Sequence, residues 1–196
     1  MTSSGGWKVV ASFLLVASLV LVPGLGEGRP SYEKRYEKIV KKWTHSGEDY
    51  TFNNLELRVQ WSACYRNSEM REAQRQYLQT LLDWNPDELQ EQVDQDEEEL
   101  RQYDEFFIGV YAGSSSLPDV GKHSGRWRIA LKVGDQVVRP VLFERVQAME
   151  LERNLYPTLD KWSHAYRIRF PKTIKAGEPF TLKMQGIPGQ SELVWK

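Results

Sequence analysis

The strongest constraint on the fold is a strict alternation of apolar and polar residues along short segments. From Leu55 to Ala63, five apolar residues alternate with four polar ones. An apolar residue at every second position turns one face of a β-strand toward a core and the other away from it. We expect the thiol of Cys64 to be buried or half-buried and to pack as a small apolar group. Cys64 nevertheless follows in the polar phase, which points it away from that core and slightly favours the alternative of a reactive thiol.

Turn signals divide the rest of the chain into further short strands. Gly134-Asp135 predicts a hairpin turn, and Pro140 places the second arm at a sheet edge or a bulge because proline has no N–H to donate. The connector 147–164 has room for one helical turn. Seven short strands favour a mainly β fold, an immunoglobulin-like antiparallel β-sandwich, with a partly open β-barrel as the alternative. The predicted strands are 50–64, 106–112, 127–133, 137–146, 165–170, 180–186 and 191–196.

A helical insertion at 67–103 interrupts the strand pattern. Asn85 suits the cap of a helix, Pro86 its first position, and Glu88 follows three residues after the cap. We therefore expect a helical hairpin between two strands of a domain spanning 50–196. The apolar positions of its first helix repeat at helical spacing and are Met70, Ala73, Tyr77, Leu78, Leu81 and Leu82.

The first 26 residues have the pattern of a secretory signal peptide. Lys8 precedes the apolar run Val9–Val22, and Pro23 and small residues lead to an expected cleavage site after Gly26. The run is shorter than the roughly 20 residues that span a bilayer. We therefore expect export to the periplasm or the cell surface; the alternative is that residues 9–25 remain as a membrane anchor.

Residues 27–49 predict a basic amphipathic helix and a linker, with Ser46–Asp49 as a loop. An apolar face runs from Tyr32 to Trp43. The helix could pack this face on the domain, or lie on an anionic membrane surface. The opposite face is basic and carries Lys34, Arg35, Lys38, Lys41 and Lys42.

Composition and motifs argue against several classes of function. Lys and Arg number 26 and Asp and Glu 27, so no basic field for nucleic acid dominates the chain. A single cysteine excludes an intramolecular disulfide framework and a cysteine-built zinc site. The chain has no Gly-x-Ser-x-Gly, His-Glu-x-x-His, phosphate-loop or dinucleotide motif. We therefore expect no cofactor, no metal and no catalysis, with His123 beside Asp119 and Ser124 as the one hydrolase candidate and His164 as a packed histidine.

Charge is distributed asymmetrically. Residues 83–105 contain eleven acidic side chains and one basic side chain, Arg101. Like charges three and four residues apart on a helix repel each other. Basic strands of the same chain, or solvent, could offset that repulsion. The alternative is that a partner protein offsets it, and we then expect the contact residues to be Glu91, Asp94, Glu97 and Glu98.

A ligand-binding domain is the alternative function. Arg128, Arg167 and Arg169 could hold an anionic polymer, since guanidinium groups pair with carboxylates and phosphates. Trp84 and Trp162 lie at connections and could stack on a sugar polymer.

The C-terminal layout resembles exported bacterial proteins of unknown function with an immunoglobulin-like end. The resemblance lies in a strand led by Trp127, the Gly134-Asp135 turn, the segment Tyr166–Pro171 and a final hairpin ending in Trp195. It covers about residues 100–196 and implies no catalytic residue. Together these features predict a non-enzymatic exported protein that serves as a cell-envelope interaction or assembly module for another envelope protein.

Overall fold

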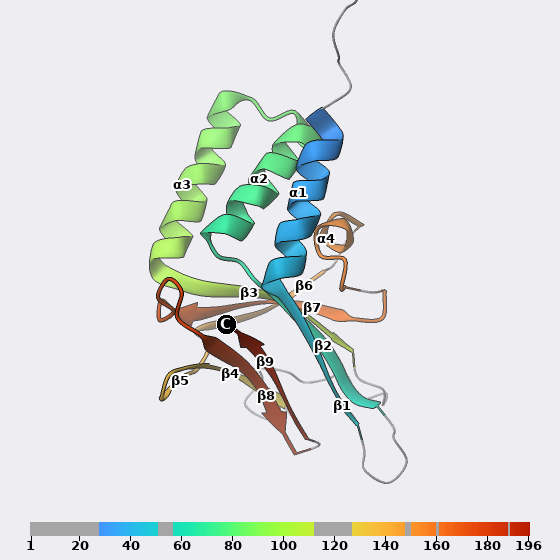
Figure 1. Ribbon diagram of the computed structural model, residues 1–196, viewed down its shortest axis with the longest axis vertical. Helices are drawn as coiled ribbons and strands as arrows, with labels where there is room; N and C mark the ends of the chain where they lie inside the picture. Colours follow the sequence, from blue (N-terminus) through green and yellow to red (C-terminus); the bar gives the residue numbers. More distant parts are fainter. Residues whose placement is uncertain (1–27, 51–56, 112–126, 148–149, 160, 188) are drawn as a thin grey trace, which may run out of the picture.

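Two antiparallel sheets and a layer of helices make up the protein (Figure 1). The computed structural model describes residues 28–196 apart from 51–56, 112–126, 148–149, 160 and 188. The expected signal peptide lies outside these residues. None of the helices in the described part of the chain is both long enough and apolar enough to cross a membrane.

The larger sheet has five strands, and every neighbouring pair is antiparallel. Its central strand is β3, which pairs with β2 on one side and β7 on the other. The order across the sheet is β1 (Thr44–Tyr50), β2 (Leu57–Tyr65), β3 (Tyr103–Tyr111), β7 (His164–Pro171) and β6 (Leu142–Val146).

The smaller sheet has four strands and packs against one face of the larger one. The two sheets form a sandwich and do not close into a barrel, which confirms the predicted β-sandwich with a helical insertion and excludes the barrel alternative. The order across this sheet is β5 (Gln136–Val138), β4 (Trp127–Val133), β8 (Phe180–Gly186) and β9 (Gln190–Trp195).

The main core lies between the sheets and is built from the alternating apolar positions. Trp61 and Trp127 are buried there, in one cluster with Phe106, Ile168 and Leu182. Burying a large apolar side chain contributes about 1.5–3 kcal/mol. The alternation that predicted the strands therefore also supplies the main stabilising contacts.

A second core covers the outer face of the five-stranded sheet. Helices α1 (Gly28–Trp43), α2 (Ser68–Leu82) and α4 (Glu150–Leu155) pack on that face (Figure 1). Cys64 points away from the main core, as its phase predicted, but these helices bury it. The expectation of a buried thiol is therefore confirmed. Burial raises the pKa of this thiol to about 11, which argues against the alternative of a reactive thiol. The buried apolar residues of this second core are Tyr36, Val40, Cys64, Met70, Ala73, Phe107, Leu155, Tyr156, Leu159 and Ala165.

The inserted hairpin consists of α2 and α3 (Pro86–Gln102). Asn85 begins α3 with the expected capping box, accepting from the N–H of Glu88 while the Glu88 carboxylate accepts from the N–H of Asn85. α3 has no buried residue. The apolar stripe of α2 leaves Leu81 and Leu82 46% and 52% exposed at its far end.

Two strand predictions differ from the structure. The segment 44–49, expected as a linker and loop, belongs to strand β1. The predicted strand 50–64 is described as β2 from Leu57 onward, since 51–56 lie outside the described residues. The arm predicted at 137–146 is broken at Pro140, so β5 and β6 lie at the edges of different sheets. Gly134 has φ +56°, which favours glycine and permits the tight β4–β5 turn.

Candidate functional site

The inner face of α3 is held by a buried ion cluster, which we define as Arg66, Arg71, Glu99, Glu105 and Arg169. Glu105 at the start of β3 has no exposed side-chain surface, and the side chain of Arg71 on α2 is 2% exposed. Arg169 Nε on β7 donates to Glu105 Oε2 at 2.5 Å, and its Nη2 donates to Glu99 Oε1 at 2.6 Å. Arg66 also donates to Glu105.

Arg71 joins the two helices of the hairpin. Its Nη1 donates to Glu99 Oε2 at 2.7 Å and to Asp96 Oδ1 at 2.8 Å, and Arg75 pairs with Asp96 as well. Burial alone would raise the pKa of Glu99, but the hydrogen bond from Arg71 and the charges of Arg71 and Arg169 lower it below its usual range. Internal charge complementarity therefore accounts for the inner acids of α3.

The outer face of α3 is different. We define the outer acidic face as Asp87, Glu91, Asp94, Glu97 and Glu98, all of which are exposed. Asp94 accepts from Gln90 at 2.7 Å, and Glu98 pairs with Arg101 of the same helix at 2.8 Å. Among the residues that the structure describes, no basic side chain of another element pairs with this face.

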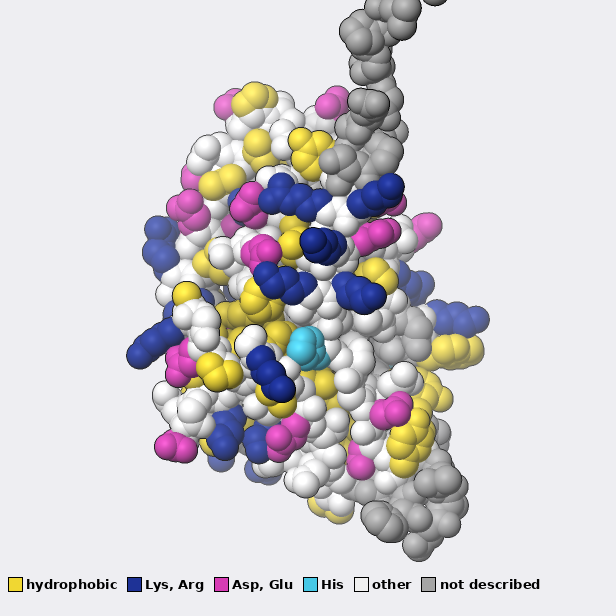
Figure 2. All heavy atoms as spheres, viewed as in Figure 1, with side chains coloured by type: hydrophobic (Ala, Val, Ile, Leu, Met, Phe, Trp, Pro, Cys, Tyr) yellow, Lys and Arg dark blue, Asp and Glu magenta, His cyan; other side chains and the backbone are white. Residues whose placement is uncertain are grey.

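Beside these acids lie an open depression and the outer end of the α2–α3 hairpin, which carries exposed apolar side chains. Asp87, Glu91 and Asp94 line the depression together with Gln90 and Gln95. Figure 2 shows hydrophobic side chains among acidic ones over the outer end of the α2–α3 hairpin. All four partner-binding residues predicted from the sequence thus lie on one exposed helical surface.

The three arginines proposed for an anionic polymer do not form one surface. Arg128 lies on the outer face of the four-stranded sheet, whereas Arg167 and Arg169 lie on the opposite side of the sandwich, on the face that the helices cover. Arg169 belongs to the buried ion cluster, and Arg167 lies 3.9 Å from Glu144.

The two tryptophans proposed for a sugar polymer are also apart. Trp84 is half-buried in the turn at the far tip of the α2–α3 hairpin, while Trp162 is in the turn that precedes β7 (Figure 1). Trp162 is 66% exposed and lies under Lys161, whose Nζ is 4.9 Å from the ring centroid. The structure therefore provides no joint stacking platform from this pair.

The histidines that the structure describes are packed side chains. His164 Nδ1 lies 2.8 Å from Arg145 Nη2, and burial together with that charge lowers the pKa of His164. His45 stacks on Trp195, and burial lowers its pKa. His123, with Asp119 and Ser124, lies outside the described residues. No group of three or more His, Cys, Asp or Glu side chains within the described ranges could hold a metal ion.

Asp104, beside Glu105, fixes the segment that follows β7. Its Oδ2 accepts from the backbone N–H groups of Thr173 at 2.6 Å and Ile174 at 2.8 Å. Its Oδ1 accepts from the Tyr65 hydroxyl and from Lys172 Nζ, both at 2.9 Å. Burial and the neighbouring Asp104 carboxylate raise the pKa of Tyr65.

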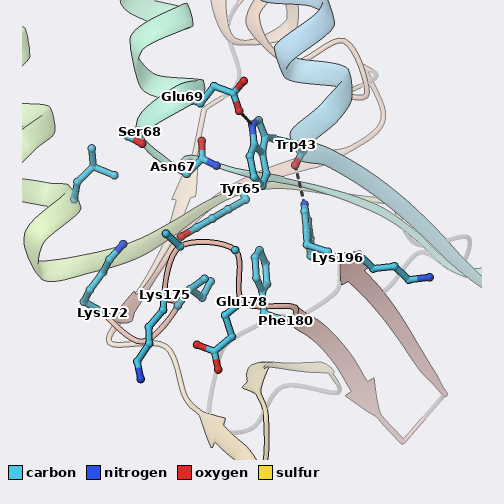
Figure 3. A pocket seen from close by; sticks show the side chains of 15 residues that line it. Trp43, Tyr65, Asn67, Ser68, Glu69, Lys172, Lys175, Glu178, Phe180 and Lys196 are labelled. Atoms are coloured by element: carbon cyan, nitrogen blue, oxygen red, sulfur yellow. Dashed lines mark hydrogen bonds between the residues drawn. The ribbon is translucent and has the colours of Figure 1, made fainter.

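That segment forms one wall of a cavity of about 480 Å³ (Figure 3). Trp43, Tyr65, Phe180 and Trp195 supply aromatic surface, and the turn Lys175–Glu178 closes one side. Asn67 and Glu69, at the start of α2, lie across from that turn. A pocket of this size accepts a small molecule.

Neither a protein-family model nor a curated protein matches this chain.

The expectation that basic strands of the same chain offset the acids of 83–105 is confirmed by Arg169, which pairs with Glu99 and Glu105. Sequence reasoning missed the contributions of Arg66 and Arg71, and it missed the cavity. Asp104 and Glu105 directly precede the run 106–112, which is apolar on both faces of the predicted strand. Two acids next to such a strand could have indicated that they are buried with basic partners. The cavity combines side chains from residues 43 to 196, so no local pattern could have pointed to it.

Proposed function

We propose that this chain is a non-enzymatic exported protein, an interaction module of the cell envelope. Its outer acidic face binds a basic amphipathic segment of another envelope protein. The observation that carries the proposal is the division of charge on α3, where the inner acids have basic partners from α2 and β7 while the outer acids face solvent. Export rests on the sequence pattern of residues 1–26.

Electrostatics favours a basic partner. Asp87, Glu91 and Asp94 recur on one side of α3 and repel each other, since residues three and four apart are neighbours on a helix. A partner carrying lysines or arginines relieves this repulsion and is steered toward the face as it approaches.

The exposed apolar end favours an amphipathic partner over a merely basic one. Leu81 and Leu82 lie at the end of α2 that leads into α3, and both are about half exposed. Exposed apolar surface rimmed by charge is typical of a protein contact. A segment with a basic face and apolar anchors satisfies both parts of the surface.

Carbodiimide crosslinking in cells tests the proposal, because it joins carboxylates directly to lysines in contact with them. We expect crosslinks from Glu91, Asp94 or Glu97 to lysines of a basic amphipathic segment in one envelope protein. Replacing Glu91, Asp94, Glu97 and Glu98 by lysine should reduce this capture by about tenfold or more, because attractive contacts become repulsive ones. The melting temperature should change little, because all four side chains are exposed and substitutions at exposed positions usually alter stability only slightly.

A matched control reverses four exposed acids outside α3, namely Glu33, Glu37, Asp135 and Glu150. This variant changes the net charge equally and should retain capture. Equal capture by the α3 variant and the wild type, or equal loss in both variants, would contradict the proposed contact surface.

A further inference from the structure

The aromatic cavity at the end of the sandwich has features that the proposed interaction surface does not use. It lies between the start of α2, the C-terminal end of α1 and the turn Lys175–Glu178, away from the outer face of α3 (Figures 1 and 3).

Its aromatic walls offer carbon surface to an occupant because their polar atoms already have partners. Trp43 Nε1 donates to Glu69 at 2.8 Å, Trp195 Nε1 donates to the Trp43 carbonyl at 3.2 Å, and the Tyr65 hydroxyl donates to Asp104. Phe180 adds a purely apolar ring. Such walls favour a flat ring, which gains from offset or edge-to-face contact with aromatic side chains.

Two hydrogen-bond donors, Asn67 and Lys172, lie near Tyr65 in the lining of the cavity. Asn67 Oδ1 is fixed by its cap bond to the N–H of Met70 at 2.9 Å, so the amide nitrogen turns toward Trp43 (Figure 3) and presents N–H donors. Lys172 gives one N–H to Asp104 and has two more. Because Asn67 and Lys172 both offer N–H donors, they favour an occupant that carries an acceptor group.

The carboxylates beside the aromatic walls already have basic partners. Lys42 pairs with Glu69 at 2.6 Å, and Lys172 pairs with Asp104 at 2.9 Å. Neither carboxylate is therefore left unpaired to repel an occupant that carries one negative charge.

We propose that this cavity is a binding site for an aromatic monocarboxylate. The ring lies against Trp43, Tyr65 and Phe180, and the carboxylate accepts from Asn67 and Lys172.

Calorimetric titration with 2-naphthoate, used as the probe, tests this site in the purified protein. We expect saturable binding of one molecule per chain. The cation 2-naphthylmethylamine has the same ring with the opposite charge, and we expect it to bind at least about tenfold more weakly, the equivalent of one charge-assisted hydrogen bond.

Two variants separate the donor from the cavity. Asn67→Asp retains an oxygen that caps α2 but replaces the donor by a carboxylate, so naphthoate binding should fall by about tenfold or more while the melting temperature is unchanged. Ala176→Phe fills the cavity from its exposed rim and should abolish binding. Gln136→Phe, which adds the same ring on the exposed strand β5, is the control and should bind as the wild type does.

Absence of saturable naphthoate binding, equal affinity for the amine, or full affinity in Asn67→Asp would each overturn the proposal. The variant with four reversed charges on α3 should bind naphthoate normally, so this result is independent of the outer acidic face.

Discussion

Glu105 and Arg71 meet beneath the helical hairpin, where Arg71 Nη2 lies 3.3 Å from Glu105 Oε1 without the alignment of a hydrogen bond. Glu105 lies near the start of the central strand β3 and Arg71 belongs to α2, so the contact ties the insertion to the sandwich. Since Arg66 and Arg169 also pair with Glu105, this one carboxylate faces three guanidinium groups.

Glu105→Gln should lower the free energy of unfolding by about 3–5 kcal/mol, because it leaves buried arginines without their shared counter-charge. Urea unfolding at neutral pH measures the change. Glu98→Gln removes the carboxylate of an exposed ion pair within α3 and should lower the free energy of unfolding far less. Similar losses of unfolding free energy in both variants would contradict the idea that burial makes the charge of Glu105 important for stability.

Acid should weaken the ion cluster through Glu99. The pKa of this carboxyl is lower in the folded protein than its ordinary value of 4.5, so the unfolded chain takes up its proton first as the pH falls. The stabilisation is therefore fully present above about pH 4.5 and is lost as the pH falls through the folded pKa. Glu99→Gln should show a shallower loss of unfolding free energy with acid than the wild type; an unchanged slope would contradict this assignment.

Much of the sandwich was predictable because strand periodicity is a local property. The strand expected from the apolar alternation is present from Leu57 to Ala63, and the capping box at Asn85 formed as the sequence indicated. Pro140 predicted a strand at a sheet edge. In the structure the strands on either side of it, β5 and β6, are edge strands of different sheets. The segment 44–50 lacks apolar alternation, so no local pattern predicted it as a strand. It becomes a strand through its pairing with β2.

The candidate site was only partly predictable. The exposure of Glu91, Asp94, Glu97 and Glu98 followed from their polar helical face. Arg169 looked like a free ligand-binding residue, since a sequence does not reveal that α3 folds back over β7 and supplies Glu99 as its partner. The same long-range folding covers Cys64, which a strand pattern alone would leave open to solvent.

Cys64 should be unreactive in the folded protein. Its thiol is buried and its pKa is raised to about 11, so little thiolate forms at about pH 8, near the ordinary thiol pKa of about 8.5. We expect an aromatic disulfide reagent to label the native protein slowly and the protein in guanidinium chloride rapidly and completely. Rapid stoichiometric labelling under native conditions would show that α1 and α2 do not protect this face.

Asp104 should control the order of the segment that walls the cavity. Asp104→Asn replaces one acceptor oxygen of the carboxylate that receives the N–H groups of Thr173 and Ile174 and the ammonium of Lys172. Hydrogen exchange of the Thr173 and Ile174 amides should accelerate by about tenfold or more, because a bond to a charged acceptor contributes about 1.5–3 kcal/mol. Exchange in β8 should change less, since those amides lie in the sheet ladder. Asp135→Asn, at the exposed β4–β5 turn, serves as the control. Unchanged exchange at Thr173 and Ile174 would mean that packing of Ile174, rather than the Asp104 carboxylate, holds the segment in place.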